Sequence, residues 1–259
     1  MRTRLAGLVV VGLIATACSG SPPLPERPGP ALTTTSSSAE VTTTTATTVA
    51  PPTGTDATVP PEGTPLAFDN ADGQRLEGRR FGSGSTFVVL AHMKPATMES
   101  WFPFAEELAA EGYSALTFNF RGYGGSEGDG FAVDIDTIAA IDEALRLGAE
   151  KVYVIGASMG GTGAIAASAQ RDVAGTVTLS APARFGEVDA VAAAADLRAP
   201  LMLIAAEGDD AYVAQARQIA DAAPVDTDVV PVDGSRHGTD LFVDHGSQLR
   251  ELILSFISR

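Results

Sequence analysis

Short, unbroken apolar runs alternate with segments of helical length along most of this chain, and this alternation limits the possible fold more than any other feature. The runs 87–90 and 201–204 contain no polar residue, which is typical of strands buried on both faces of a parallel sheet. The expected strands span 74–80, 86–91, 114–119, 151–155, 175–179, 200–205 and 226–232. The expected helices span 99–111, 131–147, 159–170, 185–196, 212–222 and 239–258. This order predicts an α/β fold in which helices flank a mostly parallel sheet.

The charge and composition of the 259 residues exclude several classes of function. Asp and Glu number 32 against 17 Lys and Arg, a net charge of −15, whereas binding to nucleic acid phosphates requires a basic surface. A single cysteine excludes an intramolecular disulfide and a zinc site built on cysteines. Three histidines offer little material for a metal site. We expect no nucleic acid, no metal and no cofactor, and a monomer.

The first 17 residues have the pattern of an export signal. Arg2 and Arg4 precede an apolar run at 5–14, which is shorter than the roughly 20 residues that span a bilayer. Cys18, the only cysteine, follows a stretch of small residues, and this arrangement resembles a bacterial lipobox with Ala15 where leucine is usual. The resemblance implies cleavage before Cys18, lipid attachment to this residue, and a place on the extracytoplasmic face of the cell membrane. The alternative is an ordinary secretory signal with an incidental cysteine.

Residues 18–64 have the composition of a disordered stalk. They contain nine prolines and a Thr/Ser-rich tract at 33–48, with almost no large apolar side chains whose burial could offset the entropy of ordering. The predicted organisation is therefore a signal peptide at 1–17, a stalk at 18–64 and an α/β domain at 65–259. The domain holds 14 of the basic and 28 of the acidic residues, so the negative charge belongs to it.

The pattern Gly-x-Ser-x-Gly, typical of a nucleophilic serine at a strand-to-helix turn, occurs twice. Ser158 lies between the expected strand 151–155 and the expected helix 159–170, as such a turn requires. The start of that helix also directs free N–H groups and the positive end of its dipole toward the serine. Ser126 lies in the run 121–130, which contains too much glycine to begin a helix and is typical of a turn. We therefore predict Ser158 as the nucleophile, with a plain turn residue as the alternative.

Five features follow one another in the order found in the α/β-hydrolase superfamily, which residues 74–258 resemble. They are His92-Met93-Lys94-Pro95 after a strand, Arg121-Gly122-Tyr123-Gly124-Gly125-Ser126, the turn at Ser158, an acidic residue after the strand 200–205, and Gly234-Ser235-Arg236-His237-Gly238. The resemblance implies the α/β-hydrolase fold and a catalytic triad in the chain order Ser, Asp, His. Met93 stands where the family usually has glycine, which reduces the backbone freedom of that loop.

His237 is the expected general base. A serine hydroxyl needs a base that takes its proton near neutral pH, and imidazole titrates in that range. His237 lies between the last expected strand and the last expected helix, where Gly234 and Gly238 let its side chain reach across the sheet edge. His92 belongs to the loop that resembles the oxyanion loop, where a structural hydrogen bond is expected. His245 falls inside the last helix as a surface residue.

The acid that orients His237 should follow the strand 200–205. Matching 206–209 to the family's Gly-Glu-x-Asp loop selects Asp209, and Asp210 is the alternative one residue further on. Asp233 lies close to the histidine in the chain but is more typical of a turn.

The oxyanion hole of the family uses two backbone N–H groups. Met159, which follows the nucleophile, is expected to supply one of them. Pro95 has no N–H, so the family pattern points to Lys94 as the loop donor, with Met93 as the alternative. The Lys94 ammonium could also attract an acidic substrate, although a solvated lysine is the simpler interpretation.

These residues predict a serine hydrolase that acts on carboxylic esters through an acyl-enzyme intermediate. A thiol nucleophile is excluded because the only cysteine lies in the signal region. Residues 180–199, between two expected strands, leave room for one helix and no large cap, so the site should be open to small or externally presented acyl groups. The alternatives are a peptidase or amidase with the same triad, and a catalytically silent lipoprotein that binds a ligand.

Overall fold

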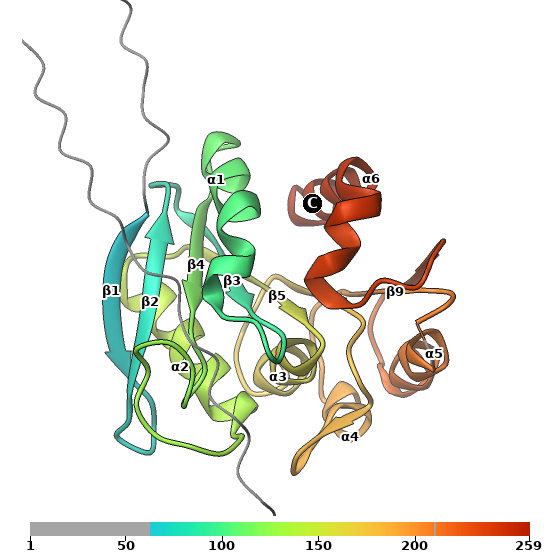
Figure 1. The fold of residues 1–259 in the computed structure, drawn as a ribbon, viewed down its shortest axis with the longest axis horizontal. Coiled ribbons are helices and arrows are strands. Elements are labelled where there is room, and N and C mark those ends of the chain that lie inside the picture. Colours follow the sequence, from blue (N-terminus) through green and yellow to red (C-terminus); the bar gives the residue numbers. More distant parts are fainter. Residues whose placement is uncertain (1–62, 210) are drawn as a thin grey trace, which may run out of the picture. The chain divides into compact units, whose positions relative to one another are not determined.

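Strands form one eight-membered sheet in the computed structural model, which describes residues 63–209 and 211–259 (Figure 1). They are β1 (Thr64–Asp69), β2 (Arg75–Phe81), β3 (Thr86–Ala91), β4 (Ser114–Phe118), β5 (Lys151–Ala157), β6 (Gly175–Leu179), β9 (Leu201–Ala206) and β10 (Thr227–Val232). Their order is β1-β2-β4-β3-β5-β6-β9-β10; the pairs β1–β2 and β2–β4 are antiparallel and the others are parallel. The predicted mostly parallel sheet flanked by helices is confirmed.

Helices cover both faces of this sheet (Figure 1). One face carries α1 (Phe102–Ala110) and α6 (Leu241–Ile257); the other carries α2 (Val133–Arg146), α3 (Met159–Ser168), α4 (Ala190–Ala194) and α5 (Tyr212–Ala222). Successive residues of β3 therefore alternate between two cores. Val88 and Leu90 pack on the α1/α6 side, whereas Phe87 and Val89 pack on the α2/α3 side. Burial on both faces explains why this strand is an unbroken apolar run.

Two segments differ from the sequence-based prediction. The sequence does not predict β1, because this edge strand buries only Phe68 and lacks an unbroken apolar run. The predicted helix 185–196 is wrong in its first half, which forms a hairpin of β7 (Arg184–Phe185) and β8 (Val188–Asp189) before α4. Gly186 turns the hairpin with a φ of +57°. Asp189 then accepts a hydrogen bond from the N–H of Ala192 and so begins α4.

The other expected helices are present, α5 with the predicted bounds and the rest with shifted ends. The 3₁₀ turns η1 (Met98–Trp101) and η2 (Gly238–Asp240) precede α1 and α6. Between β6 and β9 the chain forms only the hairpin and α4, so the described residues include no large cap, as the sequence predicts. In residues 63–209 and 211–259 no helix combines the length and the hydropathy needed to cross a bilayer. Cys18, the predicted signal peptide and almost all of the predicted stalk lie outside the described residues.

A buried ion pair joins α2 to the loop after β4. The Asp136 carboxylate, fully buried, accepts hydrogen bonds from the Arg121 backbone N–H at 3.0 Å and from its guanidinium at 2.7 Å. Asn70 donates its amide to the same carboxylate at 2.7 Å, and Arg121 also donates to Asp72 at 2.8 Å. These contacts attach the β1–β2 turn and the start of α2 to the loop 119–132.

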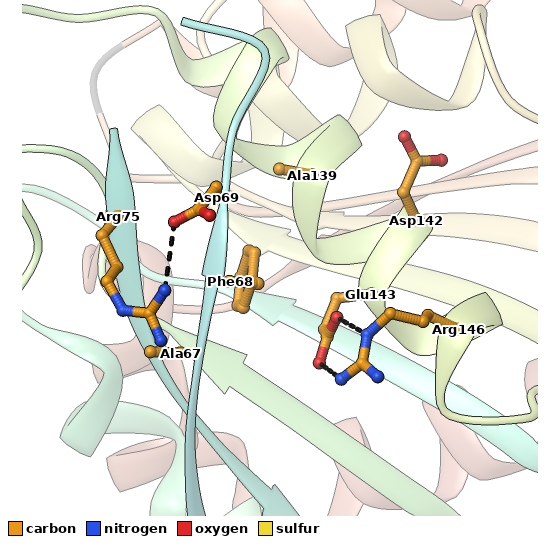
Figure 2. A pocket seen from close by; sticks show the side chains of 8 residues that line it. All are labelled: Ala67, Phe68, Asp69, Arg75, Ala139, Asp142, Glu143 and Arg146. Atoms are coloured by element: carbon orange, nitrogen blue, oxygen red, sulfur yellow. Dashed lines mark hydrogen bonds and ion pairs between the residues drawn. The ribbon is translucent and has the colours of Figure 1, made fainter. Parts of the chain in front are cut away.

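A cavity of about 380 Å³ lies beside β1 and the C-terminal half of α2 (Figure 2). Its charged groups largely pair with one another. Arg75 donates to Asp69 at 3.3 Å, and Arg146 makes two hydrogen bonds of 2.6 Å to the Glu143 carboxylate. None of its lining residues comes from the loops that follow β3, β5, β9 and β10. The predicted site residues therefore lie elsewhere.

Removal of the Asp136 carboxylate should destabilise the fold strongly. Asp136→Ala leaves the buried Arg121 guanidinium without its principal partner, and an uncompensated buried charge costs about 3–5 kcal/mol. The matched control on the same helix, Asp142→Ala, removes an exposed ion pair with Arg171 and should cost at most about 1 kcal/mol. Urea unfolding of both variants measures the two losses, and equal losses would contradict the role given to Asp136.

Candidate active site

The predicted site residues gather at the carboxyl edge of the sheet. From β3 the chain proceeds to β4 on one side, and from β5 it proceeds to β6 on the other. Such a reversal leaves a crevice between the two strands, where parallel sheets commonly bind ligands. The loop 92–97 after β3 and Ser158 after β5 border this crevice.

Ser158 occupies a sharp turn between β5 and α3. Its φ of 47° and ψ of −117° are values that residues with side chains rarely adopt. Its N–H donates to the Leu179 carbonyl at 2.8 Å and attaches the turn to β6. The strand, turn and helix that the motif requires are therefore all present around Ser158.

The two glycines of this motif are required by contacts with the backbone. A Cβ on Gly156 would overlap the carbonyl of Gly160, and a Cβ on Gly160 would overlap the carbonyl of Ala91 at the end of β3. Their absence of side chains lets the first turn of α3 lie directly against the loop after β3. The residue that follows Ser158 is thereby brought to the same crevice as residues 92–95.

Asp209 and His237 form a hydrogen-bonded pair across the ends of β9 and β10. The Asp209 Oδ2 atom lies 2.7 Å from His237 Nδ1. The Asp209 side chain is 9% exposed and that of His237 is 30% exposed, so solvent reaches the imidazole more than the carboxylate. Because Nδ1 donates to the carboxylate, Nε2 is the ring nitrogen that can accept a proton.

Backbone hydrogen bonds hold the loops of this pair together. The N–H groups of Glu207 and Gly208 donate to the carbonyls of Val232 and Gly234 at 2.8 Å and 2.7 Å. A Cβ on Gly208 would lie only 2.8 Å from the Gly234 oxygen, so the approach requires glycine at this position. The distance between Asp209 and His237 is therefore set by the backbone.

Ser158 and His237 lie close together in the fold, because Ala157, which precedes Ser158, lies near Gly238, which follows His237. A Cβ on Gly238 would lie 3.5 Å from the Ala157 Cβ and 2.6 Å from the Met93 sulfur. Among the described residues no hydrogen bond joins the Ser158 hydroxyl to the imidazole. In enzymes this bond is often long or poorly aligned before substrate binds, and it tightens in the reactive complex.

His92 is fully buried and holds the loop after β3. The Phe120 N–H donates to Nε2 at 3.2 Å, so the ring proton is on Nδ1, which donates to the Met93 carbonyl at 2.9 Å. Burial lowers the pKa of His92 to about 4, against smaller opposing effects of the Met93 carbonyl and of Glu99. The ring is therefore neutral at neutral pH, and the expected structural hydrogen bond is present.

This hydrogen bond orients the next peptide group. In a trans peptide the C=O and the N–H point in opposite directions, so the Met93 carbonyl that faces His92 turns the Lys94 N–H away from the ring. Met93 itself has no positive φ, and its side chain packs in the core, so this loop does not need the usual glycine. The N–H of Met159, in the first turn of α3, has no acceptor within the helix.

A family model described as the alpha/beta hydrolase fold matches residues 86–221, just over half of the chain. The chain belongs to the α/β-hydrolase family. Membership supports a hydrolase and agrees with the sheet order and with the turn at Ser158. No curated protein sequence matches this α/β-hydrolase significantly.

Solved structures of similar fold include several esterases. An esterase of Pyrococcus furiosus is 19% identical and has a TM-score of 0.66, with 76% of this chain and 90% of that chain covered. The enol-lactonase from Burkholderia xenovorans is 16% identical with a TM-score of 0.65, covering 75% of this chain and all (100%) of that one. An esterase from Rhodococcus is also 16% identical with a TM-score of 0.65, covering 75% and 98%. At these identities the likeness establishes the shared fold.

Other candidate residues of this α/β-hydrolase have structural partners. Ser126 donates its hydroxyl to the Asn119 carbonyl at 2.7 Å and accepts the N–H of Glu77 at 2.9 Å. His245 donates Nε2 to the Asp233 carbonyl at 2.8 Å. Asp210, the alternative acid, lies outside the described residues.

Sequence reasoning missed two residues beside the triad candidates. The ring centroid of Tyr212, at the start of α5, lies 4.6 Å from that of the His237 imidazole. Gly208 allows the loops after β9 and β10 to meet. Tyr212 carries no signal in the sequence, because any residue can begin a helix after an acidic loop. In the described part of the chain, no group of three or more His, Cys, Asp or Glu is placed to hold a metal ion.

The buried neutral His92 should make stability depend on pH. Below pH 6.5 the unfolded chain binds a proton at His92, whereas the folded protein does so only near pH 4. The free energy of unfolding should therefore fall as the pH drops from 6.5 to 4, by up to about 3 kcal/mol from this residue. Urea unfolding across this range should show a steeper loss for the wild type than for His92→Gln. His245→Gln, at a half-buried imidazole on α6, is the control for the loss of a histidine elsewhere in the fold. Parallel curves for the wild type and His92→Gln would refute the assignment.

Proposed function

We propose that this α/β-hydrolase is a serine hydrolase that cleaves carboxylic esters, with Ser158, His237 and Asp209 as its triad. The observation that carries the proposal is the 2.7 Å bond between Asp209 and His237 at the sheet edge where Ser158 occupies its strained turn. The carboxylate holds the imidazole in the tautomer with Nδ1 protonated, so Nε2 is free to act as a base. The esterases among the similar solved structures support the choice of esters.

The reaction has two steps, acylation of Ser158 and hydrolysis of the acyl-enzyme, and each step includes two proton transfers. His237 Nε2 takes the proton of the Ser158 hydroxyl while Oγ attacks the carbonyl carbon, and the same proton passes to the departing alkoxide to release the alcohol. Water then attacks the acyl ester on Ser158 as Nε2 takes one of its protons. That proton returns to Oγ when the C–O bond breaks, so the carboxylic acid leaves and the serine is restored.

The N–H groups of Met159 and Lys94 are the proposed donors to the oxyanion. Each N–H belongs to a backbone segment that other contacts hold in place. The close packing of α3 on β3 holds Met159, and the hydrogen bond between His92 and the Met93 carbonyl holds Lys94. Donors held in place before the reaction need no rearrangement as negative charge develops, and each contributes about 10²–10³ in kcat. The lack of a large cap in the described residues favours small or externally presented acyl groups.

The Ser158→Ala variant tests the function directly. We expect purified full-length protein to hydrolyse 4-nitrophenyl esters and to be labelled by a fluorophosphonate probe, and Ser158→Ala to lower ester kcat/KM about 10⁴-fold or more and abolish labelling. Ser126→Ala, at the second copy of the motif, is the matched control and should retain labelling.

A parallel panel of aminoacyl 4-nitroanilides decides between the competing functions. Faster turnover of the anilides than of the esters would make the protein an amidase or peptidase. No labelling together with no hydrolysis of either substrate would remove the hydrolytic function and leave a ligand-binding lipoprotein. Labelling that persists in Ser158→Ala would place the nucleophile at another residue.

We also propose that lipid on Cys18 anchors the mature protein to the outer face of the cell membrane through the stalk 18–64. The support is the sequence alone: a short apolar signal that ends in small residues before the sole cysteine. More than one acyl chain would be needed, because a single chain binds membranes only marginally.

Replacing the thiol tests the anchor. In a bacterial host the wild-type protein should sediment with membranes and incorporate labelled palmitate. Cys18→Ser should lose both properties, whereas Ser21→Ala should keep them. Sedimentation of Cys18→Ser with membranes, or a soluble wild-type protein, would count against lipidation.

A further inference from the structure

We propose that the Lys94 ammonium and the Phe131 ring form a subsite for an anionic group of the substrate, so that the enzyme selects esters that carry a carboxylate near the scissile bond. This inference rests on the proposed esterase function and specifies its substrate class. It concerns the side chain of Lys94, whereas the oxyanion role concerns its backbone.

Lys94 lies on the loop after β3 that borders the proposed site, and its side chain is exposed. Its backbone N–H is a proposed donor to the scissile carbonyl, so its side chain starts where the substrate is cleaved. The side chain reaches over Phe131, with Nζ 4.8 Å from the ring centroid. An aromatic face attracts an ammonium and so holds it in place. Phe131 is itself supported by an edge contact with Phe185 of β7, at 5.1 Å between ring centroids.

Lys94 has no anionic partner in the described part of the chain. The other basic residues on the loops at the carboxyl edge each have one: the pairs are Arg121–Asp136, Arg184–Asp189 and Arg236–Asp244. A shortage of acids cannot explain the exception, because residues 65–259 contain 28 acidic and only 14 basic residues. The three N–H donors of an ammonium therefore stay available to a ligand at Lys94.

Of the groups that surround Phe131, only the Lys94 ammonium would attract an anion. Phe131 also lines a groove of about 630 Å³ between α2, α3 and the β7–β8 hairpin. The charged residues of this groove are all acidic: Asp134, Glu187, Asp189 and Asp196. A carboxylate is repelled by that groove and attracted to Lys94, so the charges around Phe131 favour an anionic group at Lys94 over one in the groove.

The experiment compares two esters in the full-length protein. Mono-(4-nitrophenyl) adipate carries a carboxylate at the end of a four-methylene chain, which matches the four-carbon stem of lysine, and 4-nitrophenyl hexanoate is its neutral counterpart. The measured quantity is the ratio of kcat/KM for adipate to that for hexanoate. We expect Lys94→Met to lower this ratio about fivefold to tenfold and Lys94→Arg to restore most of it.

The matched control is Lys151→Met, at the chain's only other lysine, which lies at the opposite end of β5 and should leave the ratio unchanged. Added salt should reduce the preference of the wild type toward that of Lys94→Met. An unchanged ratio in Lys94→Met, with Ser158-dependent hydrolysis of hexanoate intact, would overturn the inference alone. Absence of Ser158-dependent hydrolysis of both esters would overturn the proposed function and the inference together.

Discussion

The first turn of α3 lies against the backbone at the end of β3, and the geometry of the whole site depends on this contact. The approach is possible because Gly160 places no side chain against the Ala91 carbonyl. The turn before α3 holds Ser158 at a φ of 47° and a ψ of −117°, a strained conformation that costs about 1–3 kcal/mol. All residues of α3 are buried, so apolar packing rather than helix propensity stabilises a glycine-rich helix and offsets this strain.

Two buried polar side chains fix the loops on the other side of the crevice. The consecutive N–H groups of Phe120 and Arg121 donate to His92 and to Asp136, which belong to different elements. The loop after β4 therefore connects the proposed oxyanion loop with the start of α2. Because neither acceptor is exposed, each hydrogen bond forms in a setting where an unpaired group would be costly. Buried contacts therefore fix the backbone of the loop that carries the exposed Lys94 side chain.

The parts of the fold that carry a periodic or steric signal could be predicted from the sequence. Unbroken runs such as 201–204 identify strands buried on both faces, and the glycines around Ser158 identify a turn that larger residues cannot form. The edge strand β1 carries little signal, because one buried Phe68 is compatible with many conformations.

The details of the candidate site depend on contacts between segments that are distant in the chain. The family loop pattern favours Asp209 over the adjacent Asp210, but only the hydrogen bond between the β9 and β10 loops pairs Asp209 with His237. The packing of Tyr212 on the His237 imidazole and the contact of the Lys94 ammonium with the Phe131 ring also join residues that are distant in the chain. A local pattern contains no information about such partners, so sequence reasoning could name Lys94 but could not choose between a solvated lysine and a binding residue.

The charge of the domain would affect an anionic substrate differently at long distance and at contact distance. The excess of carboxylates repels anionic esters, and anionic lipid headgroups, within about a Debye length of 8–10 Å. At contact distance the Lys94 ammonium, which has no anionic partner among the described residues, would attract a carboxylate in the proposed subsite more strongly than the more distant carboxylates repel it. Selection would then act on retention of the bound ester rather than on the rate of encounter. The proposed lipid anchor at Cys18 would complement this arrangement, because it would hold an acidic domain near a membrane that its own charge would not bind.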